Sequence, residues 1–165
     1  MESKKTCKIA ALAISLIVIV LALLVSADWR SVGIYVGCPL YCRASYILFH
    51  ANVIHAAVNA WCLLSIAFLY GFSASRLFLA FCAAASVPAC CLSDFPTVGM
   101  SGLVYFLLGS LAFDVARKIY YQFCMAFYIA LGCFFPNSNV LLHLYCYAVG
   151  FAVALLNKPI KIKVE

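Results

Sequence analysis

The chain has 165 residues, of which 68% are hydrophobic and only 10% are charged, and its mean hydropathy is +1.11. Because a soluble domain carries about a quarter charged residues, this composition excludes an ordinary water-soluble enzyme and predicts an integral membrane protein, built as one domain over residues 1–165. The net charge of +6 would also suit a nucleic-acid-binding protein, but the positions of the basic residues indicate a different cause.

Apolar runs long enough to cross a bilayer recur along the chain, separated by polar turns. The first run also resembles a secretory signal, with a small-residue cleavage pattern at Val25-Ser26-Ala27, but it is longer than the apolar part of a signal and we favour a retained helix. Segment 28–49 mixes aromatic and basic residues, which suits a loop lying on the bilayer surface. The six predicted spans are 9–27, 50–70, 77–92, 101–116, 119–135 and 140–156, the last two joined by a turn at 136–139.

The basic residues are distributed unevenly between the two sides of the predicted membrane. Six spans place both termini on one side, and only Arg30 and Arg43 fall on the other. The terminal side receives Lys4, Lys5, Lys8, Arg76, Arg117, Lys118, Lys158, Lys161 and Lys163. Because positive residues accumulate on the cytoplasmic side of membrane proteins, we predict cytoplasmic termini and interpret the net charge as a topology signal.

A serine lies between two glycines where a loop passes into the fourth predicted span, in the sequence Gly99-Met100-Ser101-Gly102. Glycine permits the tight backbone that lifts a hydroxyl clear of the chain. The N-terminus of a helix also offers free N–H groups and a favourable dipole to a developing oxyanion. The pattern alone is weak, because close packing of small residues in membrane helices explains most such sequences. It makes Ser101 a candidate nucleophile.

Polar side chains within the spans are a second signal, because such groups are costly in a bilayer and usually functional. Hydrogen bonding between helices is the plain alternative for any single residue. Counting about 1.5 Å per residue from the cytoplasmic helix ends nevertheless places four groups in one layer of the outer half: Ser101, His55, Asn59 and His143. Scattered structural groups would have no reason to share a depth, so we expect a hydrated chamber there.

The types and spacing of these residues suggest roles in acyl transfer. His143 is the best general base, because an imidazole can hold its proton-accepting form near neutral pH. His55 and Asn59 lie one turn apart on the same helix face, where both can donate hydrogen bonds to an oxyanion beside the Ser101 N–H. Tyr105 lies one turn below the serine and is expected to pack against the imidazole.

A carboxylate to orient the base is not evident. Asp114 follows Ser101 by about 20 Å along the predicted helix, too far to reach His143. We expect it to pair with Arg117 or Lys118 instead. The sequence therefore predicts a serine–histidine dyad.

In combination these motifs resemble the rhomboid family of intramembrane serine proteases. They occur in the family's order and on the matching spans. The matching residues are His50, His55 and Asn59 as H-x-x-x-x-H-x-x-x-N, Gly99 to Gly102 as G-x-S-G, Tyr105 and Gly109 on the same helix, and His143 with Gly150 seven residues on.

The resemblance implies an all-α membrane protein, a six-transmembrane-helix rhomboid-like bundle with both termini cytoplasmic. It implies an endopeptidase that cleaves transmembrane protein substrates in a bacterial inner (plasma) membrane, reached laterally between the second and fifth spans. Aromatic side chains of the fifth span either line that route or face lipid. The implied roles are Ser101 as nucleophile, His143 as base, His55 and Asn59 as oxyanion donors, and His50, Gly99 and Tyr105 as supporting residues.

Some positions depart from the family's pattern. Cys146 stands three residues after the base, where the family usually has a glycine, and we expect it to widen the dyad slightly. The turn at 71–76 lacks the family's glutamate. Cys38 and Cys42 share the outer loop and are candidates for a disulfide if the compartment is oxidising.

Two other functions fit parts of the pattern. A metal site built from His50, His55 and His143 would lack a nearby acid and an H-E-x-x-H motif, so we expect neither metal nor cofactor. A non-catalytic rhomboid-like protein that binds transmembrane clients would usually lack the serine or the histidine, and this chain keeps both. The expected partners are therefore transmembrane protein substrates and the lipid bilayer, and not nucleic acid.

Overall fold

The structure, a computed structural model, describes residues 2–135 and 138–157, with side chains from residue 5 onward. Over this part of the chain the regular elements are all helices, and pairing of extended backbone is limited to one antiparallel bridge between Ile34 and Thr97. The prediction of an all-α fold is therefore confirmed. The elements are α1 (Glu2–Leu24), α2 (Trp29–Val32), α3 (Cys42–Ser45), α4 (Val53–Ser65), η1 (Ile66–Tyr70), α5 (Ala74–Ala85), η2 (Ala89–Cys91), α6 (Ser101–Ser110), α7 (Lys118–Leu131), η3 (Gly132–Phe134) and α8 (Val140–Leu156).

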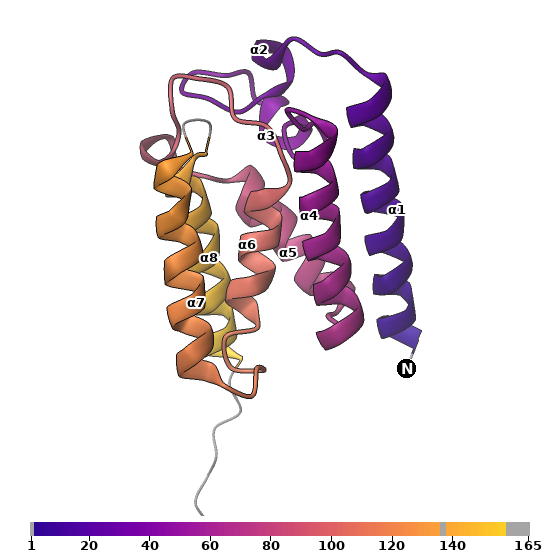
Figure 1. The fold of residues 1–165 in the computed structure, drawn as a ribbon, viewed down its shortest axis with the longest axis vertical. Coiled ribbons are helices and arrows are strands. Elements are labelled where there is room, and N and C mark those ends of the chain that lie inside the picture. Colours follow the sequence, from indigo (N-terminus) through magenta and orange to yellow (C-terminus); the bar gives the residue numbers. More distant parts are fainter. Residues whose placement is uncertain (1, 136–137, 158–165) are drawn as a thin grey trace, which may run out of the picture.

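The longer helices run roughly side by side and alternate in direction along the chain (Figure 1). Helix α6 lies near the centre, with α1 and α4 on one side, α7 and α8 on the other, and α5 passing behind. The short helices α2 and α3 lie at one end of the bundle, which we call the α2–α3 end, and α1 begins at the opposite end. Helices α6 and α8 both begin at the α2–α3 end.

Helix α6 forms much of the core, and its buried residues are Gly102, Leu103, Val104, Phe106, Leu107, Gly109 and Ser110. Two glycines bring α6 and α8 together. A Cβ atom on Gly109 would collide with the carbonyl oxygen of Tyr147, and one on Gly150 would collide with that of Phe106. Small residues of this kind let helix backbones approach closely, so the two glycines fix the spacing of α6 and α8.

Helix α8 has the predicted bounds, whereas α4 begins at Val53, three residues later than predicted. The reason is a side-chain cap: Asn52 has an extended backbone, and its side chain accepts the N–H of His55 at 2.8 Å. Asparagine is among the preferred residues at this position, since its side chain satisfies an N–H that has no partner within the helix. His50 therefore precedes α4 and lies in the loop that leads to it.

Helices α5 and α6 are both shorter than predicted. Helix α5 covers Ala74–Ala85 rather than 77–92, because Ser73 caps its start and Pro88 cannot continue a helix. Helix α6 ends at Ser110, six residues early, where the backbone hydrogen bonds tighten to a three-residue spacing. The depth estimate for Ser101, which was counted from a helix end at residue 116, therefore does not apply.

Two helical segments of the described chain are long and apolar enough to cross a membrane. One is Lys5–Leu24 in α1, and the other is Val53–Tyr70, formed by α4 and η1 together. Helices α5, α6 and α8 are apolar but shorter. Length and composition therefore mark two of the six predicted spans, and the complete six-span arrangement stays a prediction.

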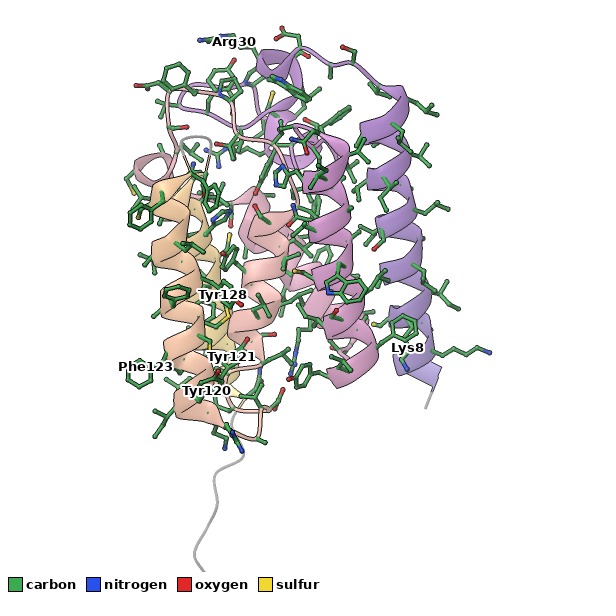
Figure 2. All side chains as sticks on the ribbon, viewed as in Figure 1. Lys8, Arg30, Tyr120, Tyr121, Phe123 and Tyr128 are labelled. Atoms are coloured by element: carbon green, nitrogen blue, oxygen red, sulfur yellow. The ribbon has the colours of Figure 1, made fainter. Side chains whose placement is uncertain are left out.

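The described basic residues divide unequally between the two ends of the bundle. Figure 2 shows Lys8 at the end where α1 begins and Arg30 at the α2–α3 end. The first end also carries Lys5, Arg76, Arg117 and Lys118, and the second also carries Arg43. The other basic residues counted in the predicted charge asymmetry lie outside the described side chains: Lys4, Lys158, Lys161 and Lys163. Residues 136–137 of the last predicted turn also lie outside the described residues.

Asp114 pairs with Arg76, with 3.3 Å between Oδ2 and Nη1. The prediction of a pair with Arg117 or Lys118 is therefore wrong. Because α6 ends early, Asp114 lies in the turn that follows it, where it reaches the start of α5 instead. Both side chains are partly exposed, so the pair contributes little to stability, typically about 1 kcal/mol or less.

Candidate active site

Ser101 and His143 meet across the interface of α6 and α8. The serine is the first residue of α6 and the histidine lies in the first turn of α8. The Nε2 atom of His143 lies 2.8 Å from Oγ of Ser101, a hydrogen-bonding distance, and both residues are half-buried. The two elements bring together residues 42 positions apart in the sequence, in the arrangement that a serine nucleophile and its base require.

The turn before Ser101 requires a glycine at position 99. Gly99 has a backbone φ of +128°, which residues with a side chain rarely adopt, and an added Cβ would lie 2.8 Å from Cε1 of His55. The first helical hydrogen bond, from the N–H of Val104 to the carbonyl of Met100, measures 3.1 Å. The N–H groups of Ser101 and the next two residues precede that bond, as in any helix N-terminus. They are available to a developing negative charge beside the serine oxygen.

The two N–H groups just before the serine are held by the loop between α3 and α4. The N–H of Gly99 donates to the carbonyl of Tyr46 at 2.8 Å, and that of Met100 donates to Nε2 of His50 at 3.2 Å. Tyr46 is fully buried and its hydroxyl donates to the carbonyl of Ala84 at 2.9 Å. Sequence reasoning missed Tyr46, because it acts on the turn through a backbone carbonyl, which no side-chain pattern reveals.

Tyr105 packs against the imidazole of His143, as predicted. The two ring centroids are 4.4 Å apart, and the planes are inclined by 23°. Tyr105 is one helical turn beyond Ser101, so α6 supplies both the hydroxyl that bonds to His143 and the ring that stacks on it. Among the described residues no carboxylate forms an ion pair with His143. Stacking on Tyr105, rather than an ion pair with an acid, restricts the orientation of the His143 ring.

Of the two predicted oxyanion donors on α4, His55 lies against the turn before Ser101 and Asn59 lies one helical turn further along. His55 lies against Gly99, and its ring meets that of His50 edge to face with centroids 5.1 Å apart. Asn59 is buried one turn further along α4, and its amide donates to the carbonyl of His55 at 3.2 Å. His55 is therefore next to the turn, whereas the amide of Asn59 bonds to the backbone of its own helix.

Asn139 links the start of α8 to the loop that leads to Ser101. Its side chain accepts the N–H of Leu142 at 3.0 Å, which caps α8, and its amide donates to Oγ1 of Thr97 at 3.5 Å. Its carbonyl accepts the N–H of His143 at 3.2 Å. Sequence reasoning treated Asn139 only as part of a turn; an asparagine just ahead of an apolar run is a cap signal that could have located it.

Cys146 is fully buried against Gly102, where an added Cβ would lie 3.2 Å from the cysteine sulfur. The predicted widening of the dyad is absent, since the distance between Ser101 and His143 is 2.8 Å. The cysteine fits because Gly102 leaves room for its side chain. Cys38 and Cys42 are free thiols, and the thiol of Cys42 donates to the carbonyl of Ser31 at 3.5 Å.

Comparison with known proteins adds no relative: no family model matches the chain, and no curated protein or solved structure does. Function is therefore inferred from the site itself. Within the described residues, His50 and His55 contact each other and His143 bonds the serine, and no cluster of three or more metal-ligating side chains occurs.

Proposed function

We propose that the protein is an intramembrane serine endopeptidase of the rhomboid type, with Ser101 as nucleophile and His143 as general base. The observation that supports this most directly is the 2.8 Å contact between Oγ of Ser101 and Nε2 of His143. It stands at the N-terminus of a helix and next to a glycine turn, and the ring of Tyr105 stacks on His143. These are the parts that acyl transfer by a serine requires.

The proposed reaction follows from these positions. Nε2 of His143 accepts the hydroxyl proton while Oγ of Ser101 attacks the carbonyl carbon of a peptide bond. The resulting oxyanion is stabilised by the Ser101 N–H and by His55, which borders the same turn. The imidazolium then returns its proton to the leaving amine as the C–N bond breaks, and a water molecule hydrolyses the acyl-enzyme by the same steps. Asn59 joins the oxyanion donors if its amide turns from the His55 carbonyl toward the serine.

A membrane location is supported by the surface of the bundle. Large apolar side chains are exposed along the long helices, including Leu16, Trp61, Leu69 and Phe123. Contiguous exposed apolar surface is rare on soluble monomers, and a bilayer would cover it. The cations gathered where α1 begins favour that end as the cytoplasmic one. We therefore propose a six-span protein with cytoplasmic termini in a bacterial inner membrane, the site lying toward the opposite side.

Substrate access is proposed between α4 and α7. Helix α7 fully buries only Met125 and Ile129, and apart from the partly buried Tyr121 and Cys124 its apolar side chains are exposed. The exposed aromatic residues on α7 and η3 are Tyr120, Phe123, Phe127, Tyr128 and Phe134, several of them visible in Figure 2. They either line the route or face lipid. A transmembrane substrate would have to unwind to present a carbonyl to Ser101, which favours segments with small or helix-weakening residues.

Labelling with a fluorophosphonate probe tests the proposal. The purified full chain in detergent should form a covalent adduct on Ser101, and Ser101→Ala and His143→Ala should abolish it. Ser110→Ala is the matched control, because it removes a buried hydroxyl from the other end of the same helix. Labelling that is absent, or that survives Ser101→Ala, would instead favour a non-catalytic protein that binds transmembrane clients.

Labelling shows a reactive serine, and a second measurement must show proteolysis. Membranes from cells that produce the wild-type chain should contain new protein termini within or beside transmembrane segments. Cells that produce Ser101→Ala at the same level should lack them. A set of termini that is the same in both would argue against peptide hydrolysis in the membrane.

A further inference from the structure

We propose that His50 is a positioning residue whose neutral imidazole accepts the Met100 N–H and thereby holds the turn that presents Ser101. This inference rests on the proposed function, because it concerns the reactivity of the same serine. His50 then acts on the backbone next to the nucleophile rather than on the substrate.

The surroundings of His50 support this role. Only 3% of the residue is exposed, and it lies ahead of α4 in the loop that leads to that helix. The Met100 N–H donates to its Nε2 at 3.2 Å, and its Nδ1 lies 3.4 Å from the carbonyl of Leu48. An Nε2 that accepts a hydrogen bond carries no proton, so the ring is the tautomer with its proton on Nδ1, facing the Leu48 carbonyl.

The bond acts at the residue that immediately precedes the nucleophile. Met100 is the N-cap of α6 and is itself fully buried, so a shift of its N–H moves the first turn of the helix. The neighbouring N–H, that of Gly99, is held by the carbonyl of Tyr46 at 2.8 Å. Two consecutive N–H groups are thus fixed by one segment of the chain. The N–H of Ser101 is the next along the backbone, and its direction follows from theirs.

Protonation of His50 would reverse the interaction. A proton on Nε2 places one donor against another, and the Met100 N–H loses its partner in a buried site, which is costly. The titratable group in ring contact with His50 is His55 of α4, 5.1 Å away between centroids. From the α6 side the ring faces Met100, which does not titrate, and from its own loop it faces the Leu48 carbonyl. A positive charge on His50 would therefore meet another histidine, and no carboxylate among the described residues forms an ion pair with it.

Two amide substitutions separate this role from simple packing. In His50→Gln the side-chain oxygen reaches about as far as Nε2 and can accept the Met100 N–H, but it takes up no proton in the range where histidine titrates. In His50→Asn the same amide stops one methylene short. Both remove the ring contact with His55 equally, so a difference between them reports the hydrogen bond to Met100.

The measurement is the second-order rate at which a fluorophosphonate labels Ser101 in the full chain, followed from neutral to acid pH. At neutral pH we expect His50→Gln to label roughly 10-fold faster than His50→Asn, since small misplacements of a nucleophile cost one to two orders of magnitude. Below neutral pH, the labelling rate of the wild type should fall more steeply than that of His50→Gln, because the wild type takes up one additional proton. His55 and His143 are present in both proteins, whereas His50 is present only in the wild type, so the additional proton is assigned to His50.

Several outcomes would overturn the inference. Equal rates for the two amide variants, both with wild-type melting temperatures, would show that the acceptor at Met100 is irrelevant. If the labelling rate fell in the same way at acid pH in His50→Gln and in the wild type, His50 would not control the turn. This comparison is sufficient by itself if His50→Asn does not fold. Failure of the proposed function looks different: the wild type itself would then show no Ser101-dependent labelling, and this inference would fall with it.

Discussion

Helices α7 and α8 both flank α6, but they are attached to it in different ways. Helix α8 has its buried residues at regular spacing along its whole length, namely Leu142, Cys146, Gly150 and Ala154. At Gly109 and Gly150 the backbones of α6 and α8 are too close to admit a Cβ atom. An attachment of this kind leaves little freedom, because interiors packed at this density resist sliding and rotation.

Helix α7 buries only Met125 and Ile129, and the side-chain hydrogen bonds that attach it to α6 and α8 lie near its start. The hydroxyl of Tyr121 donates to the carbonyl of Leu108 at 2.7 Å, and that of Tyr147 on α8 donates to Oε1 of Gln122 at 2.6 Å. Most other side chains of α7 are exposed. Ser101 and His143 are therefore carried by the closely packed pair of α6 and α8, which we call the rigid pair, and we expect α7 to be able to shift without moving either residue. This division would suit the proposed function, in which a transmembrane substrate enters beside α7.

The largest expected effect comes from breaking the rigid pair. In Gly150→Ala the new methyl group would collide with the backbone of Phe106, so α6 and α8 must separate. Overpacking of this kind typically costs about 1–3 kcal/mol, and the displaced His143 should slow fluorophosphonate labelling by roughly 100-fold. Thermal unfolding in detergent and labelling rates measure the two effects.

Gly132→Ala is the control for that change. Among the residues that the structure describes, its added Cβ would approach side-chain atoms, Oγ of Ser138 and Cγ2 of Val140, each at 3.1 Å. Side-chain ends can shift where backbone cannot, so stability and labelling should stay close to wild type. If both alanine variants behaved alike, close packing of α6 and α8 would not be what aligns the dyad.

A smaller effect is expected at Tyr105, which stacks on the base within the rigid pair. Tyr105→Leu removes the flat ring from His143 while keeping an apolar side chain, and we expect labelling to slow by about 10-fold as the imidazole loses its preferred orientation. Tyr105→Phe keeps the stack and should retain labelling. Loss of labelling in both variants would show that the hydroxyl, rather than the ring, is the functional group.

The sequence predicted the dyad better than it predicted the elements around it. Ser101 and Tyr105 lie one turn apart on α6, as their spacing suggested, since helical periodicity fixes which side chains share a face. His143 meets both of them from α8. The predicted ends of α5 and α6 were wrong, because apolar composition does not indicate where the backbone hydrogen bonds of a helix stop. A cap at Ser73 and a proline at 88 decided the bounds of α5.

Bonds from the turn before Ser101 to groups far away in the sequence could not be predicted, whereas a helix cap such as Asn139 carries a local signal. Tyr46 accepts the N–H of Gly99 through its backbone carbonyl, a group that every residue possesses, so only the three-dimensional structure reveals this hydrogen bond. His50 was predicted as a supporting residue, but its partner, the Met100 N–H, lies 50 positions away and follows from the fold alone. Asp114 was paired with the wrong cations because a helix that ends early brings it to Arg76.

The smallest effect is expected from loosening α7. Tyr147→Phe removes the hydroxyl that binds Gln122, at a cost of about 0.5–1.5 kcal/mol, the usual range for one hydrogen bond. Because that bond lies outside the α6–α8 contact, labelling of Ser101 by a small probe should not change, whereas cleavage of a transmembrane substrate should quicken if α7 must move aside. Tyr145→Phe, which removes another hydroxyl from α8, should change neither rate. A fall in probe labelling with Tyr147→Phe would show that α7 supports the dyad after all, and the division between a rigid pair and a loosely attached helix would be wrong.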